Sequence, residues 1–146
     1  MIDLKSRVKE VLEQGYLLSL GTIDGAGVWV ADVIYVSDEK FNIYWMSSPD
    51  FRHSKAIAQN PKVAGTITVS QNRSELDFAV QLEGVAEKLS GPQLVVSTKF
   101  LLKKGKPAPS MVVNILKEGY CWYKLTPTKI ELIDRKNFGF ERQTVK

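Results

Sequence analysis

The chain is organised around the stretch Tyr44-Trp45-Met46-Ser47-Ser48-Pro49-Asp50-Phe51-Arg52-His53-Ser54-Lys55. The apolar and aromatic residues of 41–46 predict a buried strand, and the two serines that follow predict a turn. Ser48 is typical of a helix N-cap, and Pro49 is typical of the first helical position, where a missing N–H costs nothing. The stretch therefore predicts a strand, a turn and a short helix in succession.

Basic side chains follow the predicted helix start. Arg52, His53 and Lys55 fall within its first two turns, close to the hydroxyl groups of Ser47 and Ser48. Free backbone N–H groups, the positive end of a helix dipole and cationic side chains together make the chemistry of a phosphate site. The alternative interpretation is a solvated basic helix face, and the stretch alone leaves both open.

The composition limits the class of protein. The 146 residues are 44% hydrophobic and 25% charged, which fits one globular domain over residues 1–146. The net charge of +4 permits binding to phosphate groups or nucleic acid without requiring it. The single cysteine, Cys121, excludes an internal disulfide, and the single histidine, His53, excludes a histidine-rich metal site. No signal-peptide core or membrane-length apolar run occurs, so a cytoplasmic protein is expected.

The first half of the chain reads as a helix followed by strands. Apolar residues at helical spacing predict an amphipathic helix from the N-terminus to Gly15, which ends it. Residues 16–23, 28–36 and 41–46 are strand-like and separated by short turns, so they are predicted to form an antiparallel meander. Residues 62–69 form the next predicted strand.

The second half adds one long strand, two helices and a hairpin. Gly84 within the predicted strand 76–89 indicates a bulge or a sharp bend. Residues 93–104 and 110–115 are predicted helices. Residues 119–124 and 129–134 are predicted to form a final hairpin around Thr126-Pro127. Many strands, short connections and few helices indicate a β-barrel of the α+β class.

Gln81 and the late aromatic residues are candidates for ligand contacts. Gln81 alternates with Val80 and Leu82, so it faces away from the core, where plain solvent exposure is the alternative. Its amide offers a donor and an acceptor together, which suits a heterocycle with an imide edge. Most tryptophans and tyrosines are expected in the core, and a minority are expected to stack on a planar ligand.

The order of elements and several motifs resemble the flavin-binding split β-barrels, the superfamily of pyridoxamine 5′-phosphate oxidase. The resemblance runs from about Val8 to Arg142 and is closest to a small, poorly characterised bacterial group that shares Arg52-His53 and Gly139-Phe140. It implies a split antiparallel β-barrel of about six to seven strands with a few peripheral helices. The motifs that carry it are Tyr16-Leu17-Leu18-Ser19-Leu20-Gly21-Thr22, residues 41–66, Val80-Gln81-Leu82-Glu83-Gly84 and Trp122-Tyr123-Lys124-Leu125-Thr126-Pro127.

The resemblance also implies a cofactor and a partner. Members of this superfamily are homodimers that bind FMN in two clefts between the subunits. By this likeness, the flavin phosphate is expected at the basic helix start, and Gln81 is expected to reach the ring, although the oxidases place their glutamine where this chain has Ala79. The late tryptophan of the family aligns nearer Tyr120 than Trp122, so either is expected in the cleft. The residues implied to bind the cofactor are Ser47, Ser48, Arg52, His53, Lys55, Gln81, Trp122 and Arg142.

One departure narrows the function. The oxidases carry an Arg-Leu-His motif near the C-terminus for their substrate, and this chain has Phe138-Gly139-Phe140 there, so oxidation of vitamin B6 is not expected. The leading hypothesis is an FMN-binding oxidoreductase of unknown substrate, with no protein acid or base identified. The alternative is a dimer that binds flavin or a small ligand without turnover. A nucleic-acid-binding barrel is disfavoured because aromatic residues are not interleaved with the basic ones.

Overall fold

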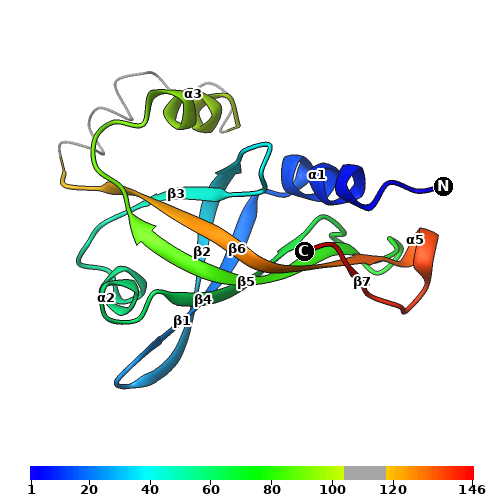
Figure 1. Ribbon diagram of the computed structural model, residues 1–146, viewed down its shortest axis with the longest axis horizontal. Coiled ribbons are helices and arrows are strands. Elements are labelled where there is room, and N and C mark those ends of the chain that lie inside the picture. Colours follow the sequence, from blue (N-terminus) through cyan, green and yellow to red (C-terminus); the bar gives the residue numbers. More distant parts are fainter. Residues whose placement is uncertain (104–117) are drawn as a thin grey trace.

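The computed structural model describes residues 1–103 and 118–146 (Figure 1). Helix α1 covers the predicted amphipathic segment and ends at Gly15, as expected. The helix predicted over residues 110–115 lies outside the described residues. No helix in the described part is long and apolar enough to cross a bilayer. The elements are α1 (Leu4–Gln14), β1 (Leu17–Asp24), β2 (Gly27–Ser37), β3 (Ile43–Ser47), α2 (Arg52–Gln59), β4 (Lys62–Thr68), β5 (Phe78–Lys88), α3 (Leu94–Lys103), β6 (Cys121–Asp134), α5 (Arg135–Phe138) and β7 (Gln143–Thr144).

The seven strands form one antiparallel sheet in the order β3-β2-β1-β4-β5-β6-β7. Strand β3 also pairs with β6, so the first six strands close into a ring. Strand β7 pairs with β6 at Glu131 and Leu132, beyond the segment of β6 that pairs with β3. The predicted meander of β1, β2 and β3 is confirmed, because β2 pairs with both neighbours across short turns. This arrangement is the predicted split barrel of the α+β class (Figure 1).

Two groups of buried side chains stabilise the barrel. The larger group fills the ring and includes Leu18, Trp45 and Leu132, each 0% exposed. Helix α1 adds Val8 and Val11 to this group, so it closes one end of the barrel. The smaller group lies under α3 and consists of Val36, Phe100 and Trp122. The barrel interior is therefore filled by protein, and any ligand site must lie on the outside of the sheet or between chains.

The predicted final hairpin is wrong, because β6 is one continuous strand through Thr126 and Pro127. Proline is normally excluded from inner strands since it has no N–H to donate, but it is tolerated at bulges. The register of β5 on β6 shifts between Glu83 and Gly84, and Pro127 lies opposite Gly84. The bulge predicted from Gly84 is thus confirmed, and the same bulge accommodates the proline that suggested a turn.

Candidate functional site

Helix α2 begins later than the sequence indicates. It begins at Arg52, with Phe51 at the N-cap position, so the prediction of Ser48 as N-cap and Pro49 as first helical residue is wrong. Ser48 instead closes a turn before the helix, because its hydroxyl accepts from the Asp50 N–H at 3.2 Å and its carbonyl accepts from the Phe51 N–H at 3.2 Å. No side chain caps α2, so its first-turn amides remain available to an anion.

Arg52 extends from the first turn of α2 to the end of β1. Its Nε and Nη2 donate to the two carboxylate oxygens of Asp24 at 2.9 and 3.2 Å. Its guanidinium carbon also lies 4.5 Å from the centre of the Trp29 ring, in cation–π contact. The hydrogen bond from Arg52 lowers the pKa of Asp24, which is therefore charged at neutral pH. The basic side chain expected to hold a phosphate thus already has an anionic partner.

Sequence reasoning missed both partners of Arg52. Asp24 lies in the short turn after the predicted strand 16–23, and Trp29 lies within the predicted strand 28–36, so neither position carries a sequence signal of contact with Arg52. Asp24 and Arg52 lie on different elements, and only the barrel brings the end of β1 next to the start of α2. A local pattern contains no information about such a pairing, so no motif search of this one sequence finds it.

His53 points into the protein from the first turn of α2. Its ring Nε2 lies 2.9 Å from Ser47 Oγ, at hydrogen-bond distance, and the two residues are 7% and 2% exposed. The ring of Phe51 packs on His53 with centroids 5.6 Å apart, and Phe51 meets Tyr120 edge to face at 5.7 Å. Burial lowers the pKa of His53, so the imidazole is neutral at neutral pH. Ser47 and His53 thus fix the junction of β3 and α2.

The buried histidine predicts a pH dependence of stability. The unfolded chain binds a proton on His53 near its ordinary pKa of about 6.5, whereas the folded chain binds it only at lower pH. The free energy of unfolding is therefore expected to fall as the pH drops from 7.5 through 6.5 to about 5.5. Urea unfolding at several pH values measures this slope. The variant His53→Gln keeps a polar group for Ser47 and should flatten this slope. An unchanged slope would show that groups other than His53 cause the pH dependence.

Lys55 and Arg52 border a hollow of about 530 Å³ beside α2. Asp24 and Asp50 border it as well, so two cations and two carboxylates face the same space. Of the four charges, Arg52 and Asp24 neutralise each other through their paired hydrogen bonds. Lys55 and the uncapped N-terminus of α2 are therefore the donors open to an anion, with the Asp50 carboxylate at the same hollow. Arg52 joins these donors only by exchanging Asp24 for the anion.

Gln81 and Arg142, two separate candidates in the sequence, contact each other on the outer face of the sheet. Arg142 Nε donates to Gln81 Oε1 at 3.1 Å. Gln81 borders a second hollow, of about 140 Å³, which Ala64 and Lys129 also border. Polar residues continue on both sides of Gln81 across paired strands, in the row Asp32, Ser19, Thr66, Gln81 and Glu131. The residues expected at the phosphate and at the ring thus border two different hollows of one chain.

Trp122 lies in the protein interior. It is 0% exposed and packs edge to face on Phe100, with ring centroids 5.6 Å apart. Tyr120, two residues earlier, is partly exposed and contacts Phe51 near the start of α2. Of the two aromatic residues expected in the cleft, Tyr120 is the one that lies near the basic residues.

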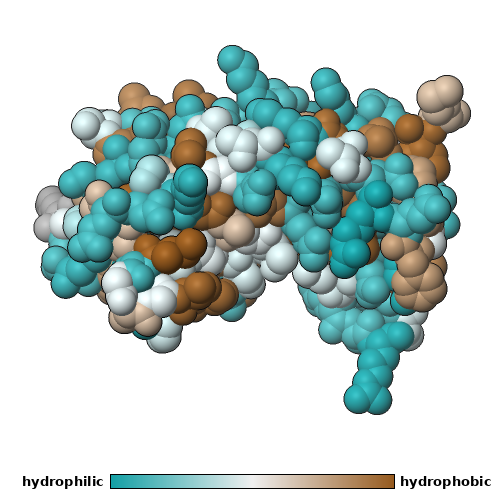
Figure 2. Space-filling view, turned by 60° about the horizontal axis from the view of Figure 1, so that its bottom comes forward, coloured by the Kyte–Doolittle hydropathy of each residue, from teal (hydrophilic) through white to brown (hydrophobic). Residues whose placement is uncertain are grey.

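An apolar surface lies on the β1–β2 hairpin, next to Arg52. Val28, Trp29 and Val30 are 74%, 44% and 60% exposed, and Ile23 is 47% exposed. Figure 2 shows brown side chains gathered at the lower left, where this hairpin comes forward. Strand β2 pairs with β1 over residues 27–34 and with β3 only over 35–37, so within the described residues its second edge has no strand partner over 27–34. Exposed apolar side chains on an open edge are typical of a protein–protein contact.

Comparison with known proteins places this geometry among split barrels. No family model matches the chain. A UPF0306 protein of Yersinia pestis is 29% identical over 115 residues, which cover 75% of this chain and 78% of that protein. HutZ, the heme storage protein of Vibrio cholerae, superposes with a TM-score of 0.68 at 16% identity, over 90% of this chain and 95% of that one. A proposed pyridoxamine 5′-phosphate oxidase of Listeria innocua gives 0.66 at 16% identity, over 90% and 98%.

These likenesses agree with the observed strand order and ring closure. At 16% identity the solved structures define the fold and carry no residue roles, while the Yersinia relatives belong to a poorly characterised group. The chain is a split β-barrel protein of the pyridoxamine 5′-phosphate oxidase-like fold.

Proposed function

We propose that this chain is an FMN-binding homodimer and an oxidoreductase of unknown substrate. The observation that carries the proposal is the set of groups at the start of α2 that can bind an anion: Arg52 and Lys55, which border one hollow, and a helix N-terminus that no side chain caps. These groups stand next to the aromatic face of Trp29 and to an exposed apolar strand. Such a site combines a phosphate subsite with a surface that suits a planar ring.

The protein residues would bind and orient the cofactor. Arg52 and Lys55 would neutralise its phosphate, Ser48 would add a hydroxyl donor, and Ser47 with His53 would hold the α2 start in place. Gln81, held by Arg142, would present its amide to the ring edge. Flavin supplies the electron-transfer chemistry when bound, and no side chain of the described site is proposed as acid or base.

A second copy of the chain would complete the site. The Arg52 hollow and the Gln81 hollow are separate in one chain, so one flavin reaching both kinds of group would need a cleft between two chains. The apolar hairpin residues Val28, Trp29 and Val30 offer the contact surface for such a homodimer. We further propose that this dimer is cytoplasmic.

Heme is the competing ligand, because HutZ is a heme storage protein and another split barrel with a TM-score of 0.77 is a heme-binding protein of Mycobacterium smegmatis. Ligation of heme iron by histidine needs an accessible imidazole nitrogen. His53 is the only histidine, it is 7% exposed, and its Nε2 is engaged by Ser47. The geometry therefore favours flavin over a histidine-ligated heme. A flavin-binding dimer without turnover differs from the proposal only in activity.

The test is spectroscopic. Purified protein incubated with FMN and then desalted is expected to keep the flavin absorbance band at about 450 nm. A colourless product contradicts the flavin proposal, and a Soret band after the same treatment with hemin would favour heme. If flavin is retained, bleaching of the band by NADH or NADPH supports an oxidoreductase. Retention without bleaching by either donor supports the binding-only alternative.

A further inference from the structure

A third hollow lies between α1, the β2–β3 turn and α3, and none of the residues proposed to bind flavin borders it. Its volume is about 380 Å³, and Lys103 from the end of α3 borders it together with Leu12, Phe41 and Leu102. The sequence shows Lys103 only as the first member of a basic run at 103–106. In the structure this lysine turns inward, which a solvated basic run does not explain.

Lys103 lies against an aromatic ring instead of a carboxylate. Its Nζ is 3.4 Å from the centre of the Tyr35 ring. Tyr35 is 0% exposed, and its hydroxyl donates to the Leu12 carbonyl oxygen at 2.7 Å, so the ring is held in place. Within the described residues, no carboxylate lies within ion-pair distance of Lys103 Nζ. Burial lowers the pKa of Lys103 to about 8.

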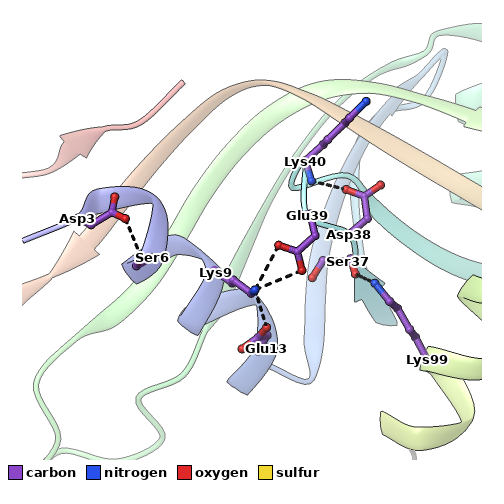
Figure 3. A network of polar contacts seen from close by, with 9 residues as sticks. All are labelled: Asp3, Ser6, Lys9, Glu13, Ser37, Asp38, Glu39, Lys40 and Lys99. Atoms are coloured by element: carbon purple, nitrogen blue, oxygen red, sulfur yellow. Dashed lines mark hydrogen bonds and ion pairs between the residues drawn. The ribbon is translucent and has the colours of Figure 1, made fainter.

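The other charged groups around this hollow have partners of their own (Figure 3). Lys9 Nζ donates to both carboxylate oxygens of Glu39 at 3.2 Å and lies 3.8 Å from Glu13. Lys99 Nζ donates to the Ser37 carbonyl oxygen at 3.2 Å.

Asp38, at the β2–β3 turn, is similarly engaged. Its side chain accepts from Asn42, from the Tyr44 hydroxyl and from backbone N–H groups. The carboxylates that face the hollow are thus used elsewhere. Among the described lysines that border it, Lys103 is the one whose amine has no oxygen partner.

We propose that Lys103 is a nucleophilic amine that binds small aldehydes covalently in this hollow. The free amine attacks the carbonyl carbon, and a carbinolamine forms as the carbonyl oxygen takes up a proton. Loss of one water molecule then gives the imine, so no oxidant or reductant is needed. The apolar wall of Leu12, Phe41 and Leu102 suits the hydrocarbon part of such a compound. This proposal is independent of flavin binding.

Reductive labelling tests the proposal on the full chain. The protein is treated with dilute acetaldehyde and cyanoborohydride for short times between pH 6 and 9.5, and ethylated lysines are located by peptide mass spectrometry. An amine of pKa about 8 has roughly 200-fold more free base at pH 7.5 than an ordinary lysine of pKa about 10.4. Because a less basic amine is also a weaker nucleophile, Lys103 should be labelled at least about 10-fold faster than the exposed lysines of the described residues. Its rate should be half-maximal near pH 8.

Two variants distinguish fast labelling of Lys103 in this hollow from the ordinary labelling of surface lysines. Lys103→Arg keeps a cation over Tyr35 and should remove the fast-labelled position. Lys99→Met alters the same helix at the border of the hollow and should leave labelling of Lys103 unchanged. Labelling of Lys103 at the rate of Lys99 and Lys9, or a rate that keeps rising past pH 9 without a midpoint, would overturn the proposal.

Discussion

Arg52→Ala is expected to weaken FMN binding by about 100-fold, because a charge-assisted contact to the phosphate is lost at the start of α2. The Arg52 side chain is 36% exposed and belongs to neither buried apolar cluster, and its ion pair with Asp24 is only partly buried, so folding should change less than binding. Fluorescence titration of FMN measures the affinity, and urea unfolding of the same sample measures stability.

Asp24→Asn is the matched control for this experiment. It removes the charged partner of Arg52 while keeping a side chain of the same shape at the end of β1. If Asp24 competes with the phosphate, Asp24→Asn should bind FMN at least as tightly as the natural chain. Equal losses of binding in both variants would show that the Arg52–Asp24 pair positions the site, and equal losses of binding and stability would make Arg52 structural.

Gly84→Ala is expected to lower the free energy of unfolding by about 3 kcal/mol, as for the severe cases of overpacking. A methyl group at Gly84 would lie 2.2 Å from the Thr126 carbonyl oxygen and 2.9 Å from Pro127 Cα. Both contacts are to backbone of β6, so no side-chain rotation relieves them. Relief requires β5 and β6 to separate at the bulge, where their register already shifts.

Gly25→Ala provides the comparison for the glycine change itself. Gly25 lies in the turn between β1 and β2, and an added methyl group there meets no atom within 4 Å. Its unfolding free energy should stay within about 0.5 kcal/mol of the natural chain. Chemical denaturation of the two variants side by side isolates the crowding at the bulge, and similar stabilities for both would contradict the interpretation of Gly84.

Local patterns predicted most of the fold. The helix that ends at Gly15, the meander and the bulge at Gly84 each depend on residues a few positions apart, and each is confirmed. The continuous course of β6 was not predictable in this way. Thr126-Pro127 has the composition of a turn, and only the glycine of a distant strand makes room for the proline inside a ladder.

In the candidate site too, contacts between residues far apart in the sequence were not predictable. The sequence correctly placed Arg52, His53 and Lys55 in the first turns of α2, but it did not show that His53 points inward to Ser47, away from the hollow that the other two border. Nor did it show that Arg52 bonds to Asp24, because that contact forms only when the barrel closes. Trp122 has the same local setting as Tyr120 in the sequence, and the packing of α3 on the sheet decides that Trp122 is interior.

The pairing of β3 with β6 has a consequence for how the chain folds. Of all the ladders in the sheet, it joins the strands that lie farthest apart along the chain. Closing so long a loop costs conformational entropy before its hydrogen bonds are gained, so this seam should form after the meander and the β5–β6 ladder. The β3–α2 junction that bears Ser47 begins at this seam, and its final geometry would therefore be among the last features to appear during folding.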